Sequence, residues 1–238
     1  MNTCPPICIF THTDYHEIFL ISLRRFEKFA PSFQIIIFTN CIIQNIDVKY
    51  RQIKYNDADV YTKKMLSCLS LLDYEYIIFI HDNNALYENV SENQISHYTD
   101  CMKTYHIDQL RLNKNGVGNT SHFHKICDTV YEIPHINSYI YSVQPTIWKL
   151  SSLIDIMSKN DYNYRDIELN IDKYMVLYKN CFYYNNEGTF INTDRHKSKL
   201  FPTIHLTQYR KWLYSENVPY IDDIFIEFNI EKEVMGYM

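Results

Sequence analysis

The sequence predicts an α/β protein with a mainly parallel central sheet flanked by helices, and two observations predict it. Short apolar runs rich in β-branched residues alternate with amphipathic runs through the first third of the chain. Runs such as IIIF and YIIFI lack polar alternation, which is typical of parallel strands buried on both faces. The resulting order, β-α-β-β-α-β, indicates a doubly wound sheet.

The first third contains four expected strands and two expected helices. We expect strands at residues 7–11, 34–39, 50–55 and 76–80. The helices are expected at residues 15–29 and 62–72, where apolar residues recur every three or four positions and so line one face. Pro31 closes the first helix, because proline cannot continue it.

The second half of the sequence is less regular. We expect helices at residues 90–105 and 145–159, strands at 109–112, 139–143 and 181–184, a partly helical stretch at 161–179, a strand end at 204–213 and a loop at 113–124. No linker, repeat or low-complexity boundary divides the 238 residues, so a single domain is the simplest account.

Composition excludes several classes of protein. Only 4 Gly occur, which excludes repeated Gly-rich phosphate loops, and the net charge of −5 argues against a general nucleic-acid binder. The 7 Cys form no CxxC pair and suit reduced thiols. No apolar run approaches the roughly 20 residues of a membrane-spanning helix. We therefore expect a cytoplasmic protein without a transmembrane segment.

Polar residues follow two of the predicted strands. Thr11-His12-Thr13-Asp14 follows the first and His81-Asp82-Asn83-Asn84 follows the fourth. In open parallel sheets, ligands bind outside the carboxyl ends of the strands, so both stretches are candidate binding residues. The alternative is that His81 to Asn84 form an ordinary polar turn, where Asp and Asn are favoured in any protein.

Four stretches together carry a resemblance to a known family. They are IFTHTD at the first strand end, YTKK at the second helix, FIHDNN at the fourth strand end, and YSVQPTIWK followed by RDIEL. The chain resembles GT-A fold nucleotide-sugar glycosyltransferases, in particular the viral and bacterial group that includes the chlorovirus rhamnosyltransferase domain. HDNN departs from the acidic DxD-type motif of that fold, because it contains one acid only.

The resemblance implies a donor and a metal ion. The donor would be a nucleotide-diphosphate sugar, most simply UDP-linked, and Mn²⁺ or Mg²⁺ would neutralise the diphosphate as it leaves. Asp82 would bind the ion, with a neutral oxygen from Asn84 or its neighbour Asn83, and His205 would be a further ligand. His81 would lie beside the ribose. Lys211 would lie near the diphosphate.

Other residues would form the nucleotide pocket. Thr11 and Asp14 would face the nucleotide, and Asp57 or Asp59, after the third strand, would complete the pocket. Lys64 would reach the base or a phosphate. Simple capping of the helix that begins near residue 15 is the alternative for Thr11 and Asp14, and a solvated lysine on a polar helix face is the alternative for Lys64.

The later acidic cluster supplies a candidate general base. Inverting transfer needs a base that takes the proton of the acceptor hydroxyl, and a carboxylate in a partly dry cleft can do this. The resemblance favours Glu168, with Asp166 and Asp172 as reserves. The alternative is that these acids stabilise a helix N-terminus. The acceptor would be a glycan or a glycoconjugate.

On this reading, residues 1–90 are the nucleotide-binding half and residues 91–238 the acceptor and catalytic half. Two other classes compete with it. A non-catalytic sugar- or nucleotide-binding module would explain the depleted HDNN motif. A nucleotidyltransferase would need a Gly-rich loop after the first strand, and THTDYHE has none.

Overall fold

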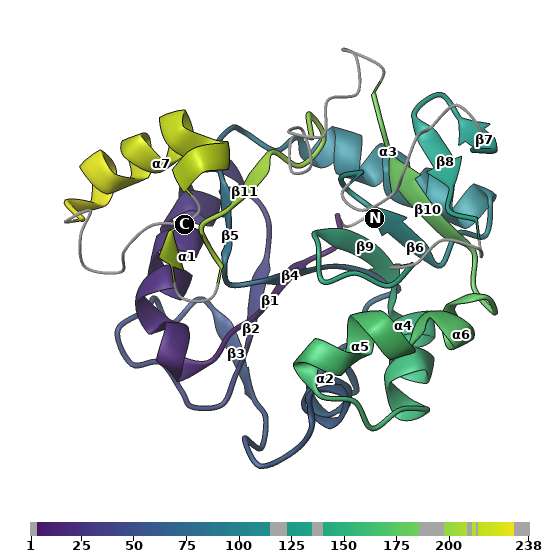
Figure 1. Cartoon of the computed structure of the whole chain (residues 1–238), viewed down its shortest axis with the longest axis horizontal. Coiled ribbons are helices and arrows are strands. Elements are labelled where there is room, and N and C mark those ends of the chain that lie inside the picture. The colour runs from purple at the N-terminus through teal and green to yellow at the C-terminus, as the bar shows by residue number, and fades with distance from the viewer. Residues whose placement is uncertain are drawn as a thin grey trace.

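The computed structural model describes residues 4–114, 123–134, 140–185, 198–208, 211–212 and 214–230. Within these ranges, nine strands form one sheet in the order β3-β2-β1-β4-β9-β6-β10-β8-β7, with helices on both faces (Figure 1). The strands are β1 (Ile7–Phe10), β2 (Ile35–Thr39), β3 (Arg51–Lys54), β4 (Tyr76–His81), β6 (Gln109–Arg111), β7 (Lys125–Cys127), β8 (Val130–Glu132), β9 (Thr146–Lys149) and β10 (Asn180–Tyr183). The predicted α/β fold class is confirmed.

The helices and the smaller strand pairs complete the described structure. The helices are η1 (Thr13–Tyr15), α1 (His16–Phe29), α2 (Tyr61–Leu69), α3 (Glu92–Thr104), α4 (Leu150–Ser158), α5 (Tyr164–Asn170), α6 (Asp172–Met175) and α7 (Tyr214–Phe228). Outside the large sheet, β5 (Asn84–Leu86) pairs with β11 (Thr203–His205), and β12 (Thr207–Gln208) pairs with β13 (Lys211–Trp212). None of these helices combines the length and hydropathy needed to cross a bilayer.

The first four strands, β3, β2, β1 and β4, all run parallel. Phe10 at the end of β1 lies between Phe38 of β2 and His81 of β4, and Thr39 of β2 lies beside Lys54 of β3. The carboxyl ends of all four strands therefore meet at one edge of the sheet. The loops that follow them are brought together there.

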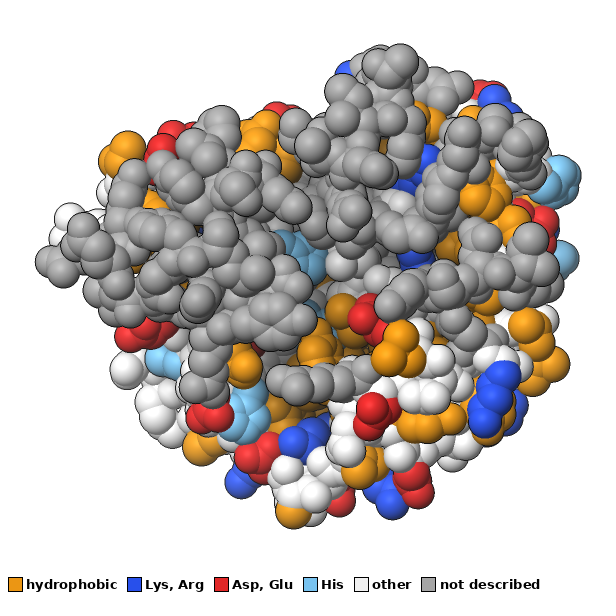
Figure 2. All heavy atoms as spheres, in the orientation of Figure 1, with side chains coloured by type: hydrophobic (Ala, Val, Ile, Leu, Met, Phe, Trp, Pro, Cys, Tyr) orange, Lys and Arg blue, Asp and Glu red, His pale blue; other side chains and the backbone are white. Residues whose placement is uncertain are grey.

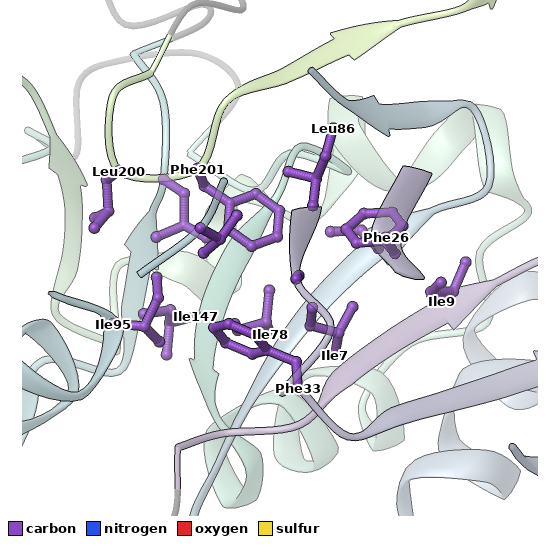
Figure 3. Close-up of a cluster of buried hydrophobic side chains, with 14 of the residues drawn as sticks. Ile7, Ile9, Phe26, Phe33, Ile78, Leu86, Ile95, Ile147, Leu200 and Phe201 are labelled. Atoms are coloured by element: carbon purple, nitrogen blue, oxygen red, sulfur yellow. The ribbon is translucent and has the colours of Figure 1, made fainter. Parts of the chain in front are cut away.

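Alternate residues of each strand enter two different cores, because successive side chains point to opposite faces. Ile7 and Ile9 of β1 pack in a cluster with Phe26 of α1 and Ile95 of α3 (Figure 3). Cys8, between them, joins the opposite core, to which α2 and α4 contribute. Burial on both faces explains why these strands read as unbroken apolar runs.

One region differs from the sequence prediction. We expected a helix from residue 145, but residues 146–149 form β9, which runs antiparallel between β4 and β6, and α4 begins only at Leu150. Ile147 and Trp148 are fully buried, one in each of the two cores. β-branched and aromatic residues suit that environment better than a helix start. The expected strand at 139–143 is also wrong for residues 140–143, which are irregular.

Two further parts of the fold were not predicted. The hairpin of β7 and β8 extends the sheet beyond β10, and α7 packs through Ile221 and Ile224 on a third apolar cluster that includes Ile18 of α1 and Ile204 of β11. Most of the expected loop at 113–124 falls outside the described residues. These additions lie around the second half of the sheet and beside α1, where sequence periodicity was weakest.

Candidate active site

The candidate site lies where β1, β3 and β4 end. Thr11 follows β1, Asp57 lies three residues after β3, and Asp82 follows β4. Hydrogen bonds connect these ends: Thr11 Oγ1 donates to Asp82 Oδ2 over 2.7 Å, and His12 Nε2 lies 3.0 Å from Asp57 Oδ2. Figure 2 shows acidic, basic and histidine side chains gathered beside hydrophobic ones on the lower part of the displayed face.

Asp82 is held by its backbone as well as by its side chain. Its N–H donates to the carbonyl oxygen of Phe10 over 3.1 Å, and its own carbonyl accepts a short hydrogen bond from Ser22 of α1. Burial raises the pKa of the Asp82 carboxyl to about 7, although hydrogen bonds, the one from Thr11 foremost, favour the ionised form. Asp82 can therefore be either protonated or ionised near neutral pH.

His81 lies one residue earlier, inside a cluster of aromatic rings. Its ring is 5.1 Å from that of Tyr164 and 5.4 Å from those of Phe10 and Phe79, and its Nε2 is 2.9 Å from the hydroxyl of Tyr61. His81 is only 6% exposed, and burial lowers its pKa to about 3. The imidazole is therefore neutral. The expected ribose contact would have to be made from this buried position.

Asn84 begins β5 and faces β11. It is fully buried; its Nδ2 donates to the carbonyl oxygen of His81 over 3.2 Å and to Asn83 Oδ1 over 3.0 Å. Its Oδ1 has no hydrogen-bond partner among the described residues. A buried acceptor without a donor is costly, so this oxygen is available for a ligand or an ion.

His205 of β11 lies directly opposite Asn84 in the β5–β11 ladder. Its Nε2 is 2.9 Å from Gln144 Oε1, which also accepts a hydrogen bond from Asn113 Nδ2 over 3.5 Å. Because the amide oxygen only accepts, Nε2 of His205 donates this hydrogen bond. Gln144 therefore sets the tautomer of His205.

The described residues fit a metal ion only as a partial set of ligands. Asp82 offers a carboxylate, Asn84 an unpaired amide oxygen and His205 an imidazole, which suit Mg²⁺ or Mn²⁺. No group of three His, Cys, Asp or Glu in the described part of the chain is arranged to hold an ion. Mg²⁺ usually takes one or two protein carboxylates and completes its coordination with substrate phosphates and water, so these residues could hold an ion only together with a bound donor.

A second, more exposed network lies at the ends of β1 and β3. Lys64 Nζ of α2 donates to Asp57 Oδ1 over 2.7 Å, and His12 contacts the other carboxylate oxygen. These two partners, Lys64 foremost, lower the pKa of Asp57 to about 2. Lys64 is also 5.3 Å from the ring centre of Tyr55. Its charge is therefore shared between Asp57 and an aromatic face.

The side chain of His12 caps the N-terminus of η1. His12 Nδ1 accepts from the N–H of Asp14 over 3.0 Å, whereas the Asp14 carboxylate is exposed and lies 3.6 Å from the same nitrogen. Capping by the Thr11 or Asp14 side chain, the alternative considered above, is not what the structure shows. Both side chains are placed at the strand-end edge.

A stacked aromatic pair lies next to the network of His12, Asp57 and Lys64. The rings of Phe10 and Tyr55 are stacked, with centres 5.0 Å apart and an angle of 3° between their planes. The Tyr55 hydroxyl donates to the carbonyl oxygen of Thr11 over 2.7 Å. The pair ties the end of β1 to the end of β3.

The predicted base, Glu168, lies on α5 and is partly buried. Its Oε1 accepts a hydrogen bond from the N–H of Val143 over 2.9 Å. Tyr164, one turn earlier on α5, contacts the rings of His81 and Tyr61, so α5 lies beside the end of β4. Asp166 is exposed in the first turn of α5.

Two predicted residues cannot be placed in full. The side chains of Lys211, in β13, and of the reserve acid Asp172, in α6, fall outside the described part of the structure. Among the described residues, sequence reasoning missed Tyr61 and Gln144 as members of the site, and it gave His12 no role of its own within the polar stretch after β1. Tyr61 and Gln144 carry no local signal.

The fold is shared with solved nucleotide-sugar enzymes. Over 97% of this chain and 41% of the other, it is similar to S. aureus TarS, with a TM-score of 0.50 and 14% identity. Over 94% of this chain and 98% of the other, it is similar to an apo UDP-glucose pyrophosphorylase, with a TM-score of 0.50 and 11% identity.

The chain spans 52% of the bifunctional IspDF of Campylobacter jejuni, a further structural match with a TM-score of 0.45. It likewise covers less than half of the TarS chain. No protein-family model and no curated protein sequence matches the chain. At these identities the likeness establishes the GT-A-like fold of nucleotide-sugar enzymes.

Proposed function

We propose that the protein is a glycosyltransferase that moves a sugar from a nucleotide-diphosphate donor, UDP-linked, to the hydroxyl of a glycan or glycoconjugate. The observation that carries the proposal is Asp82: a desolvated carboxylate, held by Thr11, at the end of β4. The fold agrees with this, since TarS has been solved with UDP and UDP-GlcNAc and the pyrophosphorylase with UDP-glucose.

The nucleotide would lie over the ends of β1 and β3. The backbone and hydroxyl of Thr11, together with Asp14, would contact the nucleotide, and the stacked Phe10–Tyr55 pair would support the pocket from below. Asp57 and Lys64 form an ion pair at this edge, and the nucleotide would contact one or both of them. His81, neutral and buried, would shape the ribose side through its rigid aromatic contacts.

The diphosphate would lie over the end of β4. Mn²⁺ or Mg²⁺, when bound there, would neutralise charge on the leaving diphosphate. Asp82 and Asn84 would supply oxygen ligands and His205 a nitrogen ligand, with Lys211 as a further cation near the diphosphate. Asp82 must be ionised to act as a ligand, so a cation beside it would lower its pKa from about 7.

Glu168 would act as the general base of an inverting transfer. Its carboxylate would take the acceptor proton while the acceptor oxygen forms its bond to the anomeric carbon and the bond to the diphosphate breaks. The hydrogen bond from Val143 fixes one of its oxygens and leaves the other to receive the proton. Asp166, exposed on the same helix, is the reserve for this role.

Composition and thiol state bear on the acceptor and on the cellular compartment. The net charge of −5 favours a glycan acceptor over a nucleic acid. All seven cysteines are free thiols, which agrees with a cytoplasmic protein.

Titration calorimetry tests the donor site directly. The chain would be titrated with UDP, GDP and dTDP, each with and without Mn²⁺. We expect one nucleotide, UDP, to bind with an affinity that depends on the ion. Absence of binding by all three nucleotides in the presence of Mn²⁺ would contradict the proposal.

A nucleotidyltransferase is the second candidate, because the chain covers 98% of the pyrophosphorylase at the same TM-score as TarS. Against it, the Thr11-His12-Thr13 turn contains no glycine to bring the backbone close to a triphosphate. The two are separated by substrate: a nucleotidyltransferase would bind UTP more tightly than UDP and release pyrophosphate from UTP and a sugar 1-phosphate.

A non-catalytic binding module of the same fold is the third candidate, favoured by the single acid in HDNN. Donor hydrolysis and transfer would be measured for the unmodified chain and for Glu168→Gln. Equal, near-zero rates in both proteins, together with intact donor binding, would favour the binding module.

A further inference from the structure

We propose that Cys101 and Cys127 are a redox modification site, at which the two thiols join in a disulfide when a disulfide oxidant such as oxidised glutathione is present. Cys101 lies on α3 and Cys127 ends β7, and their sulfurs are 3.2 Å apart. A disulfide bond is about 2.05 Å long, so the sulfurs need to approach by only about 1.2 Å. Every other thiol in the chain is also free.

The elements that carry the two thiols are already held together. Tyr98, one turn before Cys101 on α3, makes a hydrogen bond through its hydroxyl with Thr129 in the turn after β7. The ring of Tyr98 also packs edge-on against Tyr183 of β10, 5.3 Å away. The helix and the hairpin are thus fixed to each other beside the thiol pair, and bond formation needs little backbone movement.

A metal site is the main alternative use of neighbouring thiols. Structural zinc takes four ligands, and none of the described His, Cys, Asp or Glu side chains forms a ligand group of three around this pair. Burial raises the pKa of Cys181 of β10, and the nearby Cys101 and Cys127 add smaller contributions, yet no ligand group results among the described residues. Thiol oxidation is therefore the chemistry that the pair supports.

The two thiols differ in access. Cys127 is partly exposed, whereas Cys101 is 8% exposed and burial raises its pKa to about 12. Because the thiolate is the attacking form and needs access, Cys127 reacts first. Its sulfur attacks oxidised glutathione and releases one glutathione thiol.

Cys101 then loses its proton to solvent and attacks the Cys127 sulfur of the mixed disulfide. This second step releases the second glutathione thiol, so two protein thiols are oxidised and one glutathione disulfide is reduced. The product links α3 to β7, the edge strand of the large sheet, and closes a loop between residues 26 positions apart. Such a crosslink restricts the unfolded chain and so stabilises the fold.

The experiment uses the full chain, incubated with defined ratios of oxidised and reduced glutathione, quenched with acid and alkylated. Intact mass and peptide mapping then locate the oxidised residues. We expect a loss of two hydrogens, a crosslinked peptide that joins Cys101 to Cys127, and a Tm higher by about 5 °C or more that returns on reduction.

Two serine variants sharpen the result. Cys127→Ser should abolish the crosslink and the shift in Tm, whereas Cys181→Ser, which changes the nearby thiol of β10, should keep both. The proposal is overturned if Cys127 of the unmodified chain stops at the glutathione mixed disulfide, or if the main crosslink joins another pair. The mapping of the unmodified chain decides this without relying on either variant.

Discussion

The ends of β4 and β3 lie at the same edge of one sheet, yet the pKa values of the acids that follow them are shifted in opposite directions. Asp82, after β4, has its pKa raised to about 7 by burial, whereas Asp57, after β3, has its pKa lowered to about 2 by Lys64 and His12. We call the surroundings of His81, Asp82 and Asn84 the dry end, and the His12–Asp57–Lys64 network the wet end.

The two ends of this sheet edge are therefore expected to contribute differently to ligand binding. At the wet end, charges are paired and solvated, so their loss costs little and salt weakens them further. At the dry end, a single carboxylate is partly buried, and its charge is worth most when a cation or a hydrogen-bond donor meets it. Binding strength and chemistry should therefore depend on the dry end, and donor selectivity on the wet end.

The largest expected effect is on the transfer rate, from a substitution on α5, beside the dry end. Glu168→Gln keeps the size of the side chain and its ability to accept from Val143, but removes the base. We expect the transfer rate to fall roughly 10²- to 10⁴-fold with donor affinity unchanged. Single-turnover transfer and calorimetry on the same preparation measure both quantities. A rate that stays within a few-fold would assign the base to Asp166, for which Asp166→Asn is the matched variant.

The next effect is on donor affinity. Asp82→Asn preserves the shape of the side chain and removes the charge, and we expect Mn²⁺-dependent UDP affinity to fall at least the roughly 10- to 100-fold that loss of an outer-shell partner costs. Asp57→Asn at the wet end is the matched control and should change affinity only a few-fold. Equal losses in the two variants would remove the distinction between the ends.

The pH dependence of binding checks the same carboxylate. Since Asp82 must be ionised to hold a cation, UDP affinity in Mn²⁺ should fall roughly tenfold per pH unit below about 7. The Asp82→Asn variant should show a flatter profile from about 1.5 pH units below this pKa to about 1 pH unit above it.

His81 and Asp82 should make opposite contributions to stability against pH. Burial lowers the pKa of His81 to about 3, from roughly 6.5 in the unfolded chain. Protonation of His81 therefore favours the unfolded state, and the fold loses stability as pH falls from roughly 6.5 toward 3. The pKa of Asp82 is raised to about 7, so folding is favoured by its protonation and loses stability as pH rises from roughly 4 to 7.

These two slopes oppose each other in the unmodified protein between about pH 4 and 6.5, and single variants should separate them. Relative to the unmodified chain, His81→Phe should become more stable on acidification and Asp82→Asn less stable, each by up to about 1.4 kcal/mol per pH unit. Urea unfolding at several pH values measures the free energy of unfolding. Parallel pH profiles for all three proteins would show that neither group is desolvated as described.

The smallest effect is expected at the wet end. Lys64→Met keeps the packing of the side-chain stem against Tyr55 but removes the ion pair with Asp57. We expect UDP affinity to fall up to roughly fivefold, and less in high salt, as for exposed ion pairs. Calorimetry at low and high NaCl concentrations checks this. A loss as large as that of Asp82→Asn would show that Lys64 contacts the diphosphate directly.

The parallel half of the fold was predictable because its signals are local. Unbroken apolar runs marked β1, β2 and β4, and the three- and four-residue spacing marked α1 and α2. β9 was misassigned because apolar residues recur at helical spacing through TIWKLSSLIDIM without a break, and only its position between β4 and β6 makes its first part a strand. That position is a long-range feature that spacing does not encode.

The same contrast between local and long-range signals applies to the candidate site. Asp82 and Thr11 could be selected as candidates because each directly follows a buried strand, and their mutual hydrogen bond is a consequence of the parallel register. Gln144 was missed, because its role depends on His205, 61 residues away along the chain. Tyr61 begins a helix, and its sequence position predicts only a core residue. Its contact with His81 is visible only in the structure.

The pairing of β5 with β11 has a consequence for synthesis of the chain. Asn84 is translated with the first half, but its cross-strand neighbour His205 emerges more than a hundred residues later. Closing so long a loop is slow compared with forming local contacts. The parallel half can therefore assemble on the ribosome with its dry end still open, and the later segment that contains β11 completes it.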